Sequence, residues 1–186
     1  MSGGTTAASL GLSGIDSAAN SATGQDVLSL TNGFGLGNFR NSNGLAVRDA
    51  LPDLRISFRD GSSDLDIDFH SEKTLGDLLT TINAADPTRL QARISADGDH
   101  LEFTDLTSDT GGPFAVSSPM GGQLAEDLGL TGTAVNGTIT SSRLMAGLKT
   151  ALSSTLRGGS GLGTLGQVSL TDRSGATATV DLANAE

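Results

Sequence analysis

The sequence lacks cysteine, tryptophan and tyrosine altogether, and it is poor in proline and in basic residues. Without cysteine there can be no disulfide, no thiolate metal site and no cysteine nucleophile. Eleven lysine and arginine residues stand against 21 aspartate and glutamate residues, so the net charge is −10. Because such a chain repels phosphate groups, we expect neither nucleic acid nor an anionic membrane surface as a partner.

The apolar composition limits the kind of core that the chain can form. Hydrophobic residues make up 36% of the 186 residues, but aromatic residues only 3%, all of them phenylalanine. The core must therefore consist mainly of Leu, Ile, Val and Ala. The 26 glycines, against four prolines, are typical of tight turns between short strands. No apolar run reaches the roughly 20 residues that span a bilayer, and no cleavable signal peptide is visible at residue 1.

Two pairs of segments alternate apolar and polar residues, as strands with one buried face do. Residues 54–58 and 65–69, on either side of a polar turn, predict a first β-hairpin. Residues 90–94 and 101–106, on either side of Asp97-Gly98-Asp99, predict a second. A helix is predicted between the two hairpins, so the unit is hairpin, helix, hairpin.

The predicted helix has a clear beginning and a clear end. Thr74 with Asp77 three residues later matches a capping box. The apolar face consists of residues spaced at i, i+3, i+4 and i+7, namely Leu75, Leu78, Leu79 and Ile82. Pro87 prevents the helix from continuing past Asp86.

A second helix is predicted over residues 143–157. Its apolar residues recur every four positions, at Leu144, Leu148, Leu152 and Leu156, with Met145 and Ala151 beside them. Gly158-Gly159 would end it, because glycine readily adopts the left-handed conformation that follows a helix.

Similar segments recur in the same order, which predicts a tandem repeat. Leu10–Gly14 matches Leu128–Gly132, residues 54–58 match residues 166–170, and Ile67–Phe69 matches Val180–Leu182. We therefore expect a β-rich α+β fold of antiparallel hairpins and short amphipathic helices, in one or two small domains.

The repeat also predicts domain boundaries. The first repeat would occupy residues 1–122, with the hairpin–helix–hairpin unit at about 53–106 and an insertion at 41–52. The second repeat would occupy residues 123–186 and be truncated at its C-terminal end, before the helix that follows the strand pair in the first.

One segment matches a cofactor motif by pattern alone. Residues 161–166 read Gly-Leu-Gly-Thr-Leu-Gly, which fits the glycine pattern of a dinucleotide-binding loop. Such a loop needs a strand before it and a helix after it. Here a helix is expected before it and a strand, Gln167–Thr171, after it. We therefore interpret the segment as a crossover and expect no cofactor.

The remaining candidate ligands also point to turns and surfaces. Asp64, Asp66 and Asp68 alternate along a predicted strand, about 7 Å apart, which is too wide for one calcium ion without help from loops. His70 and His100 have no partner at metal-binding spacing, and no nucleophile or acid–base motif accompanies them. We predict no catalytic, cofactor-binding or metal-binding residue, and hence no enzyme.

A family resemblance rests on four segments of the first repeat. They are Asp53–Phe69, Thr74–Asn83 ending in Ile82-Asn83, Leu90–Ser95 and Gly98–Thr104, followed by Leu128-Gly129-Leu130. This series resembles the hook IN motif of flagellins and flagellar hook-associated proteins. The resemblance covers residues 53–130, and the strand pair near the C-terminus matches a second, truncated copy.

The resemblance implies an extracellular, surface-exposed insertion domain of the bacterial flagellum, in a flagellin, a hook–filament junction protein or a filament-cap protein. Such proteins are exported without a cleaved signal peptide. They assemble through long terminal heptad helices, which are not found in this sequence. We therefore expect flagellar axial subunits as partners through other regions, and a monomer or small oligomer for this chain. The alternative is an extracellular adhesin or glycan-binding repeat module.

Overall fold

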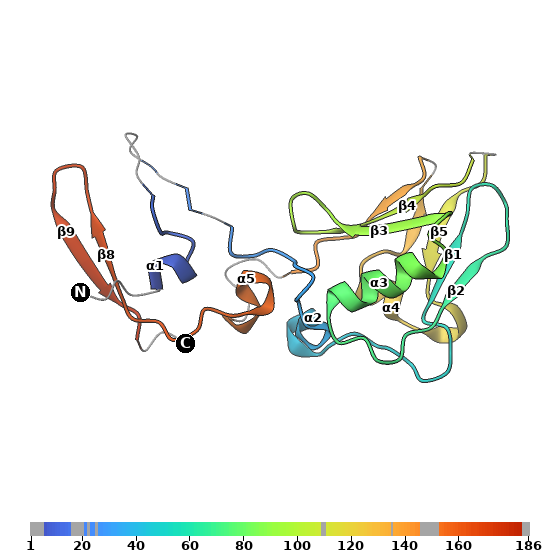
Figure 1. Ribbon diagram of the computed structural model, residues 1–186, viewed down its shortest axis with the longest axis horizontal. Coiled ribbons are helices and arrows are strands. Elements are labelled where there is room, and N and C mark those ends of the chain that lie inside the picture. The colour runs from blue at the N-terminus through green and yellow to red at the C-terminus, as the bar shows by residue number, and fades with distance from the viewer. Residues whose placement is uncertain are drawn as a thin grey trace.

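The computed structural model describes residues 6–15, 21, 23–24, 26–108, 111–134, 136–145 and 153–183, and it confirms the β-rich α+β class. Every strand pairing among these residues is antiparallel. Figure 1 shows a larger body, which contains α3 and α4, and a smaller unit in which β8 and β9 lie beside α1. No helix in the described part of the chain has the length and apolar character to cross a bilayer.

The first sheet of the body has the strand order β2-β1-β5-β6. Its strands are β1 (Leu54–Ser57), β2 (Leu65–Ile67), β5 (Phe114–Ser117) and β6 (Gly132–Ala134). β1 and β2 form the first predicted hairpin, with Leu54 opposite Ile67. The other edge of β1 pairs with β5, where Ile56 lies opposite Val116. β1 is therefore a central strand, and its inward-facing residues are completely buried.

The second sheet has the strand order β3-β4-β7. β3 (Leu90–Ile94) and β4 (Leu101–Asp105) form the second predicted hairpin, and β7 (Thr138–Thr140) pairs with β4. The prediction placed Leu106 in the returning strand, but β4 ends one residue earlier and Leu106 is exposed.

α3 (Leu75–Ala85) is the predicted helix, and it packs against β3. Thr74 caps it: the Asp77 N–H donates to Thr74 Oγ1 at 3.2 Å, and the Thr74 N–H donates to Asp77 Oδ2 at 3.0 Å. All four predicted apolar residues are buried, and the helix ends before Asp86 as expected.

The remaining helices are short. They are α1 (Thr6–Ser9), α2 (Phe39–Ser42), α4 (Leu124–Asp127) and α5 (Leu156–Gly159), with single 3-10 turns η1 (Leu36–Asn38), η2 (Pro119–Gly121) and η3 (Ser153–Thr155). One-turn helices have little stability of their own, so their positions depend on tertiary contacts.

One hydrophobic cluster fills the body between the two sheets and α3. The chain has few aromatic rings, and every one is used there: the buried phenylalanines are Phe34, Phe39, Phe58, Phe69, Phe103 and Phe114. Phe34 and Phe39 meet edge to face, with ring centroids 5.0 Å apart. Leucine, isoleucine, valine and alanine supply most of the rest, as the composition predicts.

The predicted helix over residues 143–157 is wrong at its beginning, because residues 143–145 are not helical. Toward its end the described residues form short helical turns, η3 and α5, beginning at Ser153 and Leu156, and Gly158 and Gly159 have the positive φ angles expected of a helix end. Arg157 and Gly158 adopt positive φ angles of 52° and 66°, which interrupt α5. The predicted residues Leu148, Ala151 and Leu152 lie outside the described residues.

β8 (Gln167–Thr171) and β9 (Thr177–Asp181) form a separate two-stranded sheet, with Val168 opposite Val180. The predicted strand at Gln167–Thr171 is confirmed. The sequence match aligns Val180 with Ile67, but Ile67 lies opposite Leu54 rather than opposite Ile56, the residue matched to Val168. The two hairpins thus differ in register.

The sheets of the body include residues that the sequence analysis assigned to the second repeat. β6 pairs with β5 and β7 pairs with β4, so residues 132–140 complete the sheets that β1 and β3 begin. Among the described residues, the β8–β9 hairpin has no counterpart of α3 or β5. The structure therefore does not show a tandem repeat of the whole unit.

Candidate functional site

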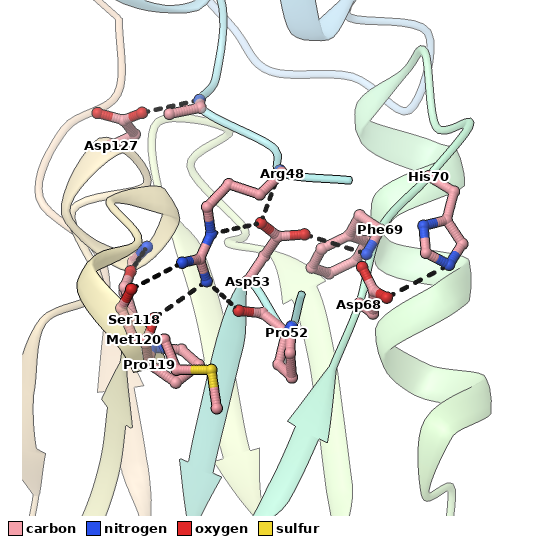
Figure 2. Close-up of polar contacts among 12 residues, drawn as sticks. Arg48, Pro52, Asp53, Asp68, Phe69, His70, Ser118, Pro119, Met120 and Asp127 are labelled. Carbon is pink, nitrogen blue, oxygen red and sulfur yellow. Dashed lines mark hydrogen bonds and ion pairs between the residues drawn. The ribbon is translucent and has the colours of Figure 1, made fainter. Parts of the chain in front are cut away.

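The most extensively bonded buried carboxylate in Figure 2 belongs to Asp53, immediately before β1. Its side chain is fully buried. Asp53 Oδ1 accepts from the Arg48 N–H at 2.9 Å, and Oδ2 accepts from the Phe69 N–H at 3.1 Å. Arg48 Nε lies 3.6 Å from Oδ1. Burying a carboxylate is costly unless it is paired and hydrogen-bonded, and both conditions are met here.

The guanidinium of Arg48 reaches a third part of the chain. Arg48 Nη1 donates to the Met120 carbonyl and Nη2 to the Pro119 carbonyl, each at 3.0 Å, and Nη2 also contacts the Pro52 carbonyl. Gly122 lies against this group, because a Cβ there would be 2.9 Å from Arg48 Nη2. We call Arg48, Asp53 and these carbonyls the Arg48 clamp; it joins residues 48–53 to η2 and, through Asp53, to Phe69 beyond the end of β2 (Figure 2).

Asp127, at the end of α4, holds another part of the predicted insertion. Asp127 Oδ2 accepts from the Ala46 N–H at 3.0 Å (Figure 2), and Oδ1 lies 3.1 Å from Arg40 Nη1. Together with the Arg48 clamp, this contact ties residues 41–52 to the body at two points. The segment that the sequence analysis treated as an insertion is thus fastened to the core.

A second buried ion pair links Arg59 and Asp105 at the ends of β1 and β4. Asp105 Oδ2 accepts from the Arg59 N–H at 2.8 Å and lies 3.5 Å from Arg59 Nε, while Oδ1 accepts from the Thr107 N–H at 2.8 Å. Gly137 packs on this guanidinium, since a Cβ there would be 2.5 Å from Arg59 Cζ. Both buried carboxylates are thus committed to backbone N–H groups and an arginine, which suits a structural role.

The aspartate row does not form a shared site. Arg55 binds Asp66 through two hydrogen bonds of 2.7 Å, and Asp64 lies 4.0 Å from the same guanidinium. Asp68 instead lies 3.4 Å from His70 Nε2. The side-chain hydrogen bond from Arg55 lowers the pKa of Asp66 below its ordinary value. Asp66 is therefore occupied in a surface ion pair.

The two histidines lie in unrelated surroundings. His70 follows β2 and is mostly exposed. His100 precedes β4, where its Nδ1 lies 3.0 Å from the Ser141 carbonyl and its Nε2 lies 3.8 Å from Asp97. In the part of the chain that the structure describes, no three His, Cys, Asp or Glu residues cluster in a way that suits a metal ion.

The glycine-rich segment at residues 161–166 is a crossover, as the sequence analysis predicted. It follows α5 and leads directly into β8, so it does not open a helix. A hollow of about 460 Å³ opens beside it, lined by serines 153, 154 and 160, small residues and leucines, with no charged side chain. A dinucleotide loop opens the helix whose N-terminus faces the pyrophosphate, whereas this segment opens a strand.

Two segments of the family resemblance, Ile82-Asn83 and Leu128-Gly129-Leu130, make contacts that hold the fold together. Asn83 lies near the end of α3 and pairs with β3: its Nδ2 donates to the Ala92 carbonyl at 2.9 Å, and its Oδ1 accepts from the Ala92 N–H at 2.7 Å. The preceding Ile82 is completely buried. Asn83 and Ile82 thus hold α3 against β3, Asn83 through hydrogen bonds and Ile82 through its buried side chain.

Leu128-Gly129-Leu130 forms the turn after α4. Both leucines are completely buried. Gly129 has φ 60°, and a Cβ there would lie 2.0 Å from Ser142 Oγ, so another residue would strain the backbone and displace the Ser142 side chain. Neither the Arg48 clamp nor the Arg59–Asp105 pair was identified from the sequence, because a lone arginine in a loop usually lies at the surface.

Comparisons with known proteins add no family assignment. No protein-family model matches the chain, no curated protein is significantly similar to it, and no solved structure matches it. The resemblance of residues 53–130 therefore stays a prediction, and the function has to be argued from the residues and their contacts.

Proposed function

We propose that this chain is a structural component of the bacterial flagellum: a surface-exposed insertion domain of a flagellin, a hook–filament junction protein or a filament-cap protein. The observation that carries the proposal is that the residues of the hook IN resemblance belong to one packed unit. From Leu54 to Leu130 the apolar positions share a single core with α3 at its side.

The contacts of the motif residues support this proposal. Asn83 bonds both backbone polar groups of Ala92, and Gly129 has a left-handed backbone conformation and lies against Ser142. A sequence pattern that includes a particular residue at such positions identifies a family more specifically than apolar periodicity alone. The resemblance thus rests on residues whose identity matters for the fold.

The use of the charged residues points the same way. Asp53, Asp105 and Asp127 each accept a hydrogen bond from the backbone N–H of a loop residue. Each of these carboxylates also forms an ion pair with an arginine. These groups hold loops in place. A surface domain of a filament needs stable loops, and these contacts supply them.

Immunogold electron microscopy on the source bacterium tests the proposal. An antibody raised against residues 1–186 should label the hook, the filament or its tip, and the labelled position distinguishes the three types of axial protein. The matched control is the same strain with an inactive flagellar export gate. There the label should disappear from the cell exterior while the protein remains detectable in lysates.

Label that persists over the cell surface without flagellar export would contradict the proposal and favour the adhesin. Motility offers an independent readout. Deleting the gene should abolish swimming, and the intact gene should restore it. Normal filaments and normal swimming in the deletion strain would also contradict the proposal.

A further inference from the structure

β8 has an edge that carries none of the residues that normally protect an edge strand against pairing. Among the described residues, only β9 pairs with it. Its sequence, Gln167-Val168-Ser169-Leu170-Thr171, has no charged residue, proline or glycine. Edge strands are normally protected by charged residues, by proline or by being very short. A five-residue uncharged edge is therefore available to another strand.

The hydrogen bonds of the hairpin identify the groups that point outward. The Leu182 N–H donates to the Gly166 carbonyl, and the Asp172 N–H donates to the Ala176 carbonyl. Hydrogen-bonded and non-hydrogen-bonded pairs alternate along an antiparallel ladder. Ser169 and Thr179 consequently form a non-hydrogen-bonded pair, so Ser169 directs its N–H and C=O away from β9. Thr179 does the same on the opposite edge.

The hairpin is also amphipathic. One face carries polar pairs, with Ser169 Oγ 3.1 Å from Thr179 Oγ1 and the Thr171 and Thr177 hydroxyls also 3.1 Å apart. The other face is apolar. α1 packs beside β8 and Val168 is buried, but Leu170 is 54% exposed. The apolar face thus remains partly uncovered, and two strands alone seldom form a stable sheet.

Edges of the body differ from this one. β2 carries Asp66 between Asp64 and Asp68, which resists pairing with another acidic chain. β3 carries Arg93, and β6 and β7 are three residues long. In the body, moreover, the strand matched to β8 in the sequence is β1, and β1 does have a second neighbour, β5. The result there is a four-stranded sheet with fully buried inward residues.

We propose that the β8 edge binds a second copy of this chain, with the two β8 strands antiparallel about a two-fold axis at Ser169. The product is a four-stranded sheet, β9-β8-β8-β9, the same size as the sheet of the body. Pairing centred there uses all five residues of β8 and places Val168 of one copy opposite Leu170 of the other. A two-fold axis lets identical edges satisfy each other.

Charge does not oppose a second copy at this place. Residues 166–183 contain two aspartates and one arginine, a net charge of −1, whereas the whole chain carries −10. Repulsion between two copies that meet here is therefore weak. In the proposed pairing the two Asp172 side chains lie at opposite ends of the new ladder. The inference does not depend on the flagellar proposal.

Light scattering with a pair of proline variants tests the edge. The wild-type chain should approach about twice its mass of 18.7 kDa as concentration rises. Ser169→Pro removes an outward N–H on β8 and should stay monomeric. Thr179→Pro is the matched control: it lies directly opposite in the hairpin, also removes an outward N–H, and should still dimerise.

Disulfide trapping keeps the test independent of proline effects on folding. The chain has no cysteine, so each single variant reports one contact. Ser169→Cys should give a covalent dimer under mild oxidation, since residues paired across strands lie within disulfide range, and Thr179→Cys should not. A monomeric wild type at all concentrations, a dimeric Ser169→Pro, or cross-linking only through Thr179→Cys would each overturn the proposal.

Discussion

The β1–β2 hairpin of the body and the β8–β9 hairpin near the C-terminus have similar sequences but very different environments. In β1, Leu54 and Ile56 are completely buried. In β8, Val168 is buried, but Leu170 is 54% exposed, and β9 is exposed along its whole length. The same alternation of apolar and polar residues therefore accompanies opposite degrees of burial.

Tertiary neighbours account for this difference. β1 lies between β2 and β5, while α3 packs against the adjoining sheet through β3. The β8–β9 hairpin contacts α1, a single helical turn. Local alternation specifies a hairpin, whereas the stability that the hairpin contributes depends on how much apolar surface its neighbours remove from water.

The largest effect that separates the two regions is expected from Asp53→Ala. This substitution would remove the carboxylate that accepts from the Phe69 N–H and pairs with the Arg48 guanidinium. The Arg48 side chain is only 23% exposed, so water cannot fully replace the carboxylate. Removing one member of a buried pair costs about 3–5 kcal/mol. Urea unfolding should therefore show a much lower midpoint. The control is Asp181→Ala, on the exposed strand β9, where the midpoint should not change measurably; equal losses in both variants would contradict the clamp's role.

An intermediate effect is expected from a pair of apolar truncations at matched positions. Ile67 is 3% exposed, and Val180, its counterpart in the sequence match, is 46% exposed. Ile67→Ala should lower the free energy of unfolding by about 2–5 kcal/mol, through lost burial and the cavity left behind. Val180→Ala should cost less than about 1 kcal/mol in dilute solution. A larger loss at Val180 would show that the hairpin is better covered than the structure indicates.

The smallest effect concerns acid stability. The Arg89 side chain, followed by that of Thr88, hydrogen-bonds Asp86 and lowers its pKa from 3.8 to about 2. Because the folded pKa is depressed, the contribution of this group is present above pH 3.8 and is lost as the pH falls toward 2. Asp172, in the β8–β9 turn, also has a lowered pKa, but the first cause is the Ser174 hydroxyl.

Carboxyl-carbon NMR titration checks this difference with an internal control. Arg89→Met keeps an unbranched stem near Phe58, over which the guanidinium now lies at 4.3 Å. The variant should raise the pKa of Asp86 toward its ordinary value and leave Asp172 unchanged. An unchanged Asp86 would assign the low pKa to Thr88 instead of Arg89.

Much of the body could be predicted because its signals are local. Thr74 and Asp77 sit at capping spacing, and the alternation at residues 54–58 and 90–94 marks one buried face. The helix expected over residues 143–157 does not begin where predicted, since residues 143–145 are not helical and a four-residue spacing of leucines does not exclude turns. Near its end, Arg157 and Gly158 adopt left-handed backbone angles, which for Gly158 the sequence predicted.

The contacts that organise the loops were not predictable in the same way. Arg48 and Met120 are far apart in sequence, and nothing local to Arg48 announces that its guanidinium meets the carbonyls of Pro119 and Met120. Arg59, in the turn after β1, and Asp105, at the end of β4, are likewise far apart in sequence. Whether a charged residue is buried depends on partners that only the folded chain supplies.

The sequence by itself determined the α+β class, the two hairpins of the body, the capped helix and the strand after the glycine-rich segment. Each follows from periodicity, capping or turn chemistry within a few residues. Only the tertiary structure decided which hairpin becomes a core, that β6 and β7 complete the sheets of the body, and that Asp53 and Asp105 are buried. Those outcomes depend on pairing between distant segments, and the sequence pattern of a strand does not specify its second neighbour.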